Sequence, residues 1–127
     1  MSHYILIADD DPVVLHILGS ILAVGGHEVL RVDSGQGCLE QLARDKEQNK
    51  LPSILFLDNL LGDITGLEVL AKLRESFGED LMPIVLLSAN TKAEMSDYDV
   101  DVLPEYFLEK PFTSETVNSV IAQILGT

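Results

Sequence analysis

The stretch YILIADDDP, residues 4–12, begins with five hydrophobic residues and continues with three aspartates and a proline. Its hydrophobic part shows no alternation with polar residues, and neither do two later runs, residues 54–57 and 84–87. A strand of this kind buries both of its faces, as the inner strands of a parallel sheet do when helices cover the sheet on both sides. The stretch therefore predicts an inner strand that ends at the aspartates.

Two further runs, residues 29–32 and 106–108, bring the number of predicted strands to five. Arg31 lies inside the first of these two and indicates an edge strand. Between the strands, apolar residues recur at the spacing of one helix face. The predicted helices run from Pro12 to the Gly25-Gly26 pair, from Ser34 to about Asp45, from Thr65 to Phe77, and from Val117 to Leu125.

A weaker helical pattern covers residues 91–103, where three aspartates alternate with Tyr98, Val100 and Val102 and predict a short or loose helix. Strand and helix alternate five times, which predicts an α/β fold of parallel strands joined by right-handed crossovers, with helices on both faces. A chain of 127 residues with 46% hydrophobic residues can build one core. We therefore expect a single domain over residues 1–127.

The charge and the cysteine content limit the possible functions. Eight Lys and Arg against 21 Asp and Glu give a net charge of −13, which disfavours direct binding to nucleic acid or to an anionic membrane. Cys38 is the only cysteine, so no internal disulfide forms. We expect its side chain to be buried and to pack as a small hydrophobic residue. The apolar runs are too short to span a membrane, and the first residues lack the pattern of a signal peptide. These features predict a cytoplasmic protein.

Polar residues follow four of the five predicted strands. They are Asp9, Asp10 and Asp11 after the first, Asp58 after the third, Ser88 after the fourth and Lys110 after the fifth. Ala89, next to the serine, adds only its backbone N–H. Ligand sites of open parallel sheets lie at the carboxyl ends of the strands. We therefore expect these groups to meet at one edge, although Asp11, directly before Pro12, is better explained as the cap of the first helix.

Carboxylates held close together repel one another at neutral pH unless protons or a cation offset their charge. An oxygen-only set suits Mg²⁺, and no spacing brings His3, His16 or His27 to the cluster for zinc. The lysine adds a positive charge, the serine a hydroxyl, and the following alanine a backbone N–H. Together these are the components of phosphoryl transfer, namely an oxygen nucleophile, a metal and hydrogen-bond donors.

In order and spacing the set resembles the receiver domain of two-component response regulators. The matching residues are Asp9-Asp10, Asp58, Ser88-Ala89 and Lys110-Pro111-Phe112. Gly66 stands eight positions after Asp58, and Lys110 stands 22 positions after Ser88. The resemblance covers essentially the whole chain. It implies a flavodoxin-like (βα)₅ three-layer sandwich, with a five-stranded parallel sheet in the strand order 2-1-3-4-5.

Carried over residue by residue, the resemblance implies that Asp58 is the phosphoacceptor. The phosphoryl donor would be a phosphohistidine of a sensor histidine kinase or of a histidine phosphotransfer protein. Asp10 and Asp58 would bind Mg²⁺ together with the backbone carbonyl of Leu60, and Asp9 would act mostly through water. A receiver catalyses its own phosphorylation and dephosphorylation and signals to a downstream protein, so it is not a conventional enzyme.

The resemblance also assigns the remaining positions. Lys110 would pair with the phosphoryl oxygens, and Ser88 would turn inward to hydrogen-bond one of them beside the N–H of Ala89. Phe107, three residues before the lysine, occupies the aromatic switch position of the family. Family members often have a cis peptide bond before the proline that matches Pro111.

Two segments differ from the family pattern. The Met-Pro pair that often follows the acceptor is Leu61-Gly62 here, which predicts a more mobile loop. The Gly-Ala pair that usually precedes the fifth strand is replaced by Val102-Leu103-Pro104. This second change concerns the face that receivers usually use for signalling, whereas the residues expected to carry the chemistry are intact.

The sequence is less compatible with several other functions. A Mg²⁺-dependent phosphohydrolase would need a substrate pocket that 127 residues provide with difficulty, and a flavin binder would need a phosphate loop rich in Ser, Thr and Gly after the first strand. A degenerate receiver would act only as a protein-interaction module. A calcium loop at Asp97, Asp99 and Asp101 would require Gly and Glu where Val102 and Leu108 stand. The sequence leaves open whether the chain acts alone or belongs to a longer regulator.

Overall fold

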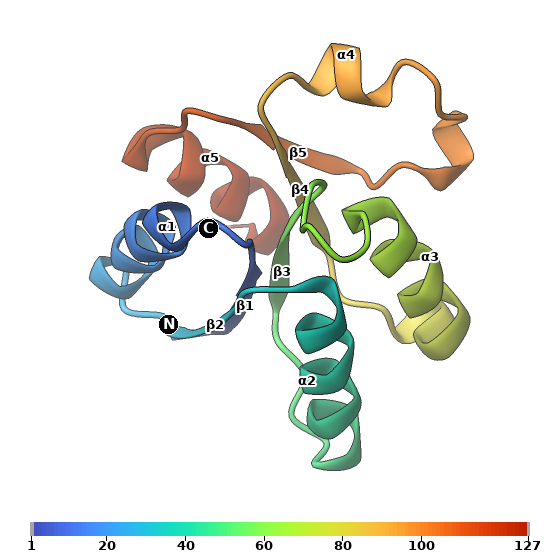
Figure 1. Cartoon of the computed structure of the whole chain (residues 1–127). Helices are drawn as coiled ribbons and strands as arrows, with labels where there is room; N and C mark the ends of the chain where they lie inside the picture. The colour runs from blue at the N-terminus through green and yellow to red at the C-terminus, as the bar shows by residue number, and fades with distance from the viewer. Residues whose placement is uncertain (1, 127) are drawn as a thin grey trace.

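The computed structural model describes residues 2–126, which form one central sheet between two layers of helices (Figure 1). The strands are β1 (Tyr4–Ala8), β2 (Glu28–Val32), β3 (Ile54–Asp58), β4 (Ile84–Ser88) and β5 (Tyr106–Glu109). Neighbouring strands pair in parallel in the order β2-β1-β3-β4-β5. The expected fold class and strand order are confirmed, and the strand that contains Arg31 lies at an edge of the sheet.

The helices are α1 (Pro12–Val24), α2 (Gly35–Glu47), α3 (Gly66–Phe77), α4 (Thr91–Met95) and α5 (Ser114–Leu125), with short 3₁₀ helices η1 (Gly78–Asp80) and η2 (Val100–Val102). Asp11 caps α1, since its carboxylate accepts a hydrogen bond from the N–H of Val13 at 2.9 Å. Gly126 ends α5 in a left-handed conformation. Within residues 2–126, no helix combines the length and apolar character needed to cross a membrane.

The side chains of the inner strands divide the core into two clusters. On one face, alternate residues of β1, β3 and β4 pack against α1 and α5. On the other face, the intervening residues pack against α2 and α3, with Met95 of α4 and the fully buried Cys38 among them. Burial on both faces explains why these strands lack polar alternation. Because these strands run parallel, the carboxyl ends of β1, β3, β4 and β5 lie at the same edge of the sheet.

The segment between β4 and β5 is the least regular part of the fold. The helix α4 has five residues, and η2 adds a single turn. Tyr98, Val100 and Val102 are exposed, so the apolar residues of this segment do not form a buried helical face. The expected short helix is therefore confirmed, and the alternating aspartates are its cause, because solvated carboxylates interrupt the apolar stripe that a longer helix would bury.

Candidate functional site

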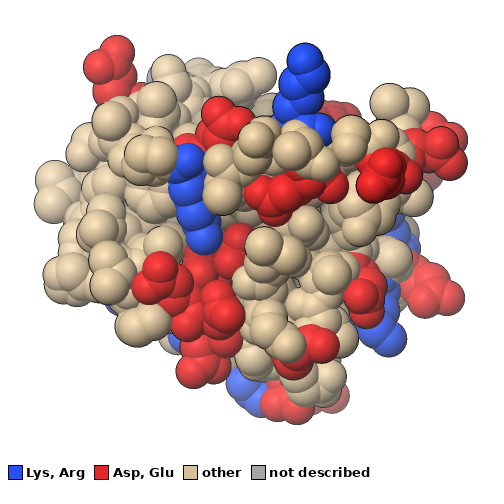
Figure 2. All heavy atoms as spheres, turned by 45° about the horizontal axis from the view of Figure 1, so that its top comes forward, with Lys and Arg blue, Asp and Glu red and all other residues tan. Residues whose placement is uncertain are grey.

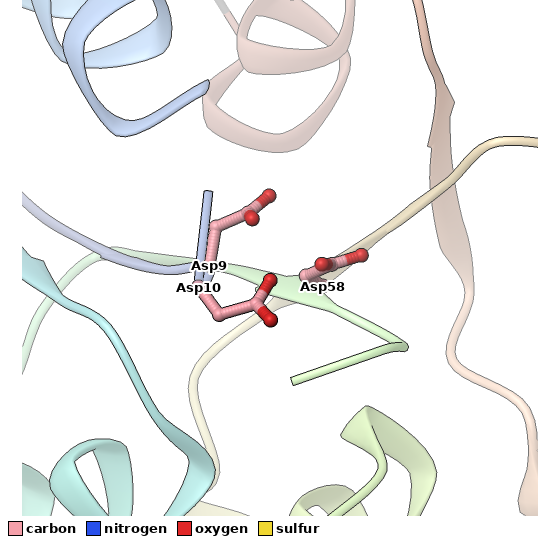
Figure 3. Close-up of side chains that lie close together, drawn as sticks. All are labelled: Asp9, Asp10 and Asp58. Carbon is pink, nitrogen blue, oxygen red and sulfur yellow. The ribbon is translucent and has the colours of Figure 1, made fainter. Parts of the chain in front are cut away.

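The carboxyl edge of the sheet carries a cluster of carboxylates, which we call the acidic cluster: Asp9, Asp10 and Asp58. Figure 2 shows the side of the molecule that lies at the top of Figure 1, where acidic side chains gather around isolated basic ones. One carboxylate oxygen from each member lies within 4.8 Å of the others. Asp9 and Asp10 follow β1 and Asp58 ends β3, and the carboxylate of Asp10 points toward Asp58 (Figure 3). Asp9 and Asp58 are buried and Asp10 is exposed.

Lys110 directly follows β5 and reaches back to this cluster. Its Nζ lies 2.9 Å from Oδ2 of Asp9 and 3.4 Å from Oδ1 of Asp58. Burial by itself would lower the pKa of the ammonium, but its contacts with the two carboxylates outweigh this effect and raise the pKa. Lys110 therefore stays charged and supplies the positive charge that offsets part of the repulsion in the cluster.

The environment of Asp58 disfavours its ionised form. Burial is the largest cause, followed by the negative charge of Asp9, and together they raise the pKa of Asp58 to about 6. The charge of Lys110 and a hydrogen bond from the backbone N–H of Leu60 act in the opposite direction. They do not prevail, because the ammonium lies closer to Asp9 than to Asp58 and is shared between them. A cation placed among these oxygens would therefore hold Asp58 ionised at neutral pH.

The oxygens of Asp9 already have partners from the protein. Oδ2 accepts a hydrogen bond from Lys110, and Oδ1 accepts one from the backbone N–H of Asp11 at 2.9 Å. Asp10 differs, since it is exposed and its carboxylate faces Asp58 (Figure 3). The donor set as a whole consists of oxygens, which fits Mg²⁺ and does not fit zinc.

Ser88 ends β4, the strand between those that carry Asp58 and Lys110. Its side chain is buried, and its hydroxyl lies 2.7 Å from the hydroxyl of Thr91, so one of the two donates to the other. Ala89 follows and is exposed. The sequence analysis did not predict Thr91 as the partner of Ser88. The feature that could have indicated it is a second hydroxyl three residues after Ser88, at the first position of the short helix.

The loop between β3 and α3, residues 59–65, is called the acceptor loop here because it follows Asp58. Its two ends are fastened together, since Leu60 and Thr65 form a bridge and the N–H of Gly66 donates to the carbonyl of Asn59 at 2.9 Å. Gly66 is required there, because a Cβ would lie 2.4 Å from the backbone oxygen of Asp58. The side chain of Leu60 is exposed, so this residue contributes its backbone rather than its side chain to the site.

Phe107 and Pro111 lie beside this site rather than in the acidic cluster. Phe107 is half-buried in β5, opposite Leu86 of β4, and packs against the core cluster under α2 and α3. The peptide bond between Lys110 and Pro111 is cis, as expected. Both residues also line a hollow of about 510 Å³ together with side chains along α5, from Glu115 to Gln123.

Comparison with known proteins identifies the family. The model of the "Response regulator receiver domain" matches residues 5–122. Response regulator MprA of Mycobacterium leprae (strain TN) is 35% identical over 121 residues, which cover 95% of this chain and 50% of that protein. The chain spans about half the length of the curated relatives it matches.

Solved structures agree on the fold. The chemotaxis response regulator CheY4 of Vibrio cholerae superposes with a TM-score of 0.82 at 22% identity, covering 98% of this chain and 99% of that one. The receiver domain of the sensor histidine kinase PA1611 from Pseudomonas aeruginosa PAO1 superposes with a TM-score of 0.83 at 21% identity, covering 100% of both chains. That structure has a magnesium ion coordinated in its active site cleft. The match of the family model over nearly the whole chain, together with the fold, shows that this chain belongs to the response regulator receiver domain family of two-component systems.

Proposed function

We propose that this receiver accepts a phosphoryl group on Asp58 and changes conformation to signal to a downstream protein. One observation carries the proposal: Asp58 lies in a cluster with Asp9 and Asp10 and within 3.4 Å of the Lys110 ammonium, although the four residues come from three different strands. Receiver domains take phosphoryl groups from histidine kinases. The donor is accordingly a phosphohistidine on a sensor histidine kinase or on a histidine phosphotransfer protein.

The chemistry is a displacement at phosphorus. An oxygen of the Asp58 carboxylate forms a bond to phosphorus while the bond from phosphorus to the histidine nitrogen breaks, and the electron pair stays on the imidazole. Lys110 and the N–H of Ala89 stabilise the charge on the phosphoryl oxygens. Hydrolysis of the resulting acyl phosphate later restores the carboxylate and ends the signal.

Asp10, Asp58 and the backbone carbonyl of Leu60 would hold Mg²⁺, which would neutralise charge on the transferring phosphoryl group. Asp9 has both oxygens engaged by Lys110 and by the N–H of Asp11, which supports a role for Asp9 through water rather than through direct coordination. The magnesium ion in the PA1611 receiver domain supports this choice of metal.

Phosphorylation would rearrange the contacts that the unphosphorylated protein makes. The modification adds nearly two negative charges to a site where carboxylates already outnumber cations. Lys110 would turn from Asp9 toward the phosphoryl oxygens, and Ser88 would exchange its contact with Thr91 for one of these oxygens. To change the ratio of active to inactive conformation from 1:99 to 99:1, phosphorylation must stabilise the active conformation by about 5.5 kcal/mol relative to the inactive one. Several charge-assisted contacts are able to supply this free energy. Phe107 would transmit the change to the surface around β5.

The proposed receiver occupies residues 1–127 and works inside the cell, where its kinase partner presents the phosphohistidine.

The test is incubation with acetyl phosphate and Mg²⁺, followed by intact mass measurement. We expect one added phosphoryl group on the wild type, released by hydroxylamine as acyl phosphates are, and none on Asp58→Asn. Asp33→Asn is the matched control, because Asp33 is an exposed carboxylate just after β2, outside the acidic cluster. Equal labelling of wild type and Asp58→Asn would move the acceptor elsewhere.

Two other outcomes correspond to the alternative functions. A folded wild type that takes up neither phosphate nor beryllofluoride would be a degenerate receiver that acts as an interaction module. Repeated turnover of a small phosphate ester would identify a phosphohydrolase.

A further inference from the structure

The tip of the acceptor loop lies next to the acidic cluster. Gly62 has a φ of 86°, a left-handed conformation that proline would not permit. A Cβ built on this glycine would lie 3.4 Å from Oδ2 of Asp10. The Leu61-Gly62 pair therefore brings the backbone against Asp10, and any shift of the loop changes the space next to that carboxylate.

The residue after this glycine fastens the tip to a different element. The carboxylate of Asp63 accepts one hydrogen bond from the N–H of Gly35 at 3.0 Å and another from the N–H of Gln36 at 2.9 Å. These N–H groups belong to the first turn of α2 and have no partner within their own helix. Asp63 also stands at the positive end of the helix dipole, where a carboxylate is favoured. The N–H groups of Gln36, Gly35 and Ile64 lower its pKa to about 2.

A second contact supports the same attachment. Ile64 packs so closely on α2 that a Cβ at Gly35 would lie 2.4 Å from its Cγ1. The helix does not depend on Asp63 alone, because the Ser34 hydroxyl caps it by accepting a hydrogen bond from the N–H of Gly37 at 2.9 Å. The helix and the loop can therefore be perturbed separately.

We propose that Asp63 is a positioning residue for the Mg²⁺ site, which holds the acceptor loop against Asp10 in place of the rigidity that a proline would give. The inference rests on the proposed function, since it takes the acidic cluster as the Mg²⁺ site. Without the attachment, the main chain of Leu60 and the space between Asp10 and Asp58 lose their fixed geometry. Outer partners of metal ligands commonly contribute tenfold or more to metal affinity.

The test is calorimetric titration of the full chain with Mg²⁺ at neutral pH. We expect Asp63→Ala to weaken the Mg²⁺ dissociation constant about tenfold. Ser34→Ala is the matched control, because it removes a cap from the same helix end without touching the loop, and its affinity should equal that of the wild type. Thermal unfolding without Mg²⁺ measures how far each variant destabilises the fold.

Further variants separate position from charge. Asp80→Ala removes an exposed carboxylate from η1 and controls for the lost negative charge. Asp63→Asn keeps one hydrogen-bond acceptor and should show an intermediate affinity, and it carries the comparison if Asp63→Ala does not fold. The loss should persist at high salt, where the general attraction of the protein for cations is screened.

The outcomes distinguish this inference from the proposed function. A wild type that binds no Mg²⁺ at the acidic cluster overturns the proposed function. A wild type that binds Mg²⁺, with Asp63→Ala and Asp63→Asn no weaker than Ser34→Ala, overturns the role of Asp63 and leaves the proposed function standing.

Discussion

At the scale of the residue, the protein keeps its acceptor carboxylate in an unfavourable environment. The pKa of Asp58 lies at about 6 in the fold, above its ordinary value of 3.8, because the residue is buried next to the charge of Asp9. A carboxylate whose pKa is raised on folding favours the fold at low pH, and this contribution is lost as the pH rises from about 4 to about 6. The metal-free protein is therefore destabilised at neutral pH by the residue it needs for its proposed chemistry.

We predict that Asp58→Asn raises the free energy of unfolding of the metal-free protein at neutral pH by about 2 kcal/mol. The difference between variant and wild type should grow between pH 4 and pH 6 and then level off. Urea unfolding at several pH values, with EDTA present, measures it. Asp33→Asn should leave the pH dependence unchanged, and a less stable Asp58→Asn protein at neutral pH would show that the burial of Asp58 is offset by its contacts.

Lys110 stabilises the metal-free fold, whereas Asp58 destabilises it, because Lys110 is the cation that two buried carboxylates share. We predict that Lys110→Ala lowers the free energy of unfolding of the metal-free protein by about 2 kcal/mol, less than for a fully buried pair because the lysine is partly exposed. Its Mg²⁺ affinity should be at least that of the wild type, since the ammonium repels the metal. The conformational response to beryllofluoride, followed by NMR chemical shifts, should be blunted.

Lys72→Ala, at an exposed cation of α3, is the matched control for Lys110→Ala. A loss of Mg²⁺ affinity in Lys110→Ala alone would mean that the lysine organises the metal site rather than the phosphoryl group.

At the scale of the element, one side chain of α3 secures the irregular part of the fold. Arg74 donates from Nη1 to the carbonyl of Asp101 at 3.2 Å and from Nη2 to the carbonyl of Leu103 at 2.9 Å. These carbonyls lie in and directly after η2, where the chain has few internal hydrogen bonds. Arg74 therefore substitutes for the packing that a longer α4 would supply.

We predict that Arg74→Ala increases proteolytic cleavage within residues 96–103 severalfold, while the free energy of global unfolding falls by about 1 kcal/mol or less. Limited proteolysis with mass mapping of the fragments measures the first, and urea unfolding the second. Lys72→Ala removes a cation from the same helix and should change neither. Unchanged cleavage in Arg74→Ala would show that the segment is held by other contacts.

Some of these elements and contacts could be predicted from the sequence, and others could not. Continuous apolar runs such as residues 54–57 identify buried strands, because a strand covered on both faces has no solvent side on which to place polar residues. The order of strand ends then brings Asp10, Asp58 and Lys110 to one edge, which is a consequence of topology alone. The attachments of Asp63 to α2 and of Arg74 to η2 were not predicted, because an exposed charged residue that binds backbone groups has no sequence pattern of its own.

The prediction of a more mobile loop at Leu61-Gly62 illustrates the same limit. It follows correctly from the missing proline, since glycine leaves the backbone free. The structure shows two attachments that the local sequence does not reveal, the hydrogen bonds of Asp63 and the packing of Ile64 on Gly35. Both depend on a helix start 28 residues earlier in the chain. The mobility of the loop stays a prediction, to be measured by amide hydrogen exchange.

At the scale of the whole molecule, the net charge of −13 makes two effects of Mg²⁺ possible. Acidic side chains outnumber basic ones on the face shown in Figure 2. Any salt weakens their mutual repulsion and stabilises the fold, whereas a bound ion adds a further stabilisation that depends on its own affinity. Only a comparison at constant ionic strength separates binding from screening.

We predict that NaCl raises the free energy of unfolding of the wild type and of the double variant Asp10→Asn/Asp58→Asn alike. At matched ionic strength, Mg²⁺ at about 100 times its dissociation constant should add about 2.7 kcal/mol to the wild type and nothing to the double variant, which lacks two of the proposed ligands. Urea unfolding with Mg²⁺ or with NaCl measures the stabilisation by screening and the stabilisation by Mg²⁺ binding. An equal gain from Mg²⁺ in both proteins would mean that the ion acts through the overall charge, and the acidic cluster would then be a consequence of the acidic surface rather than a metal site.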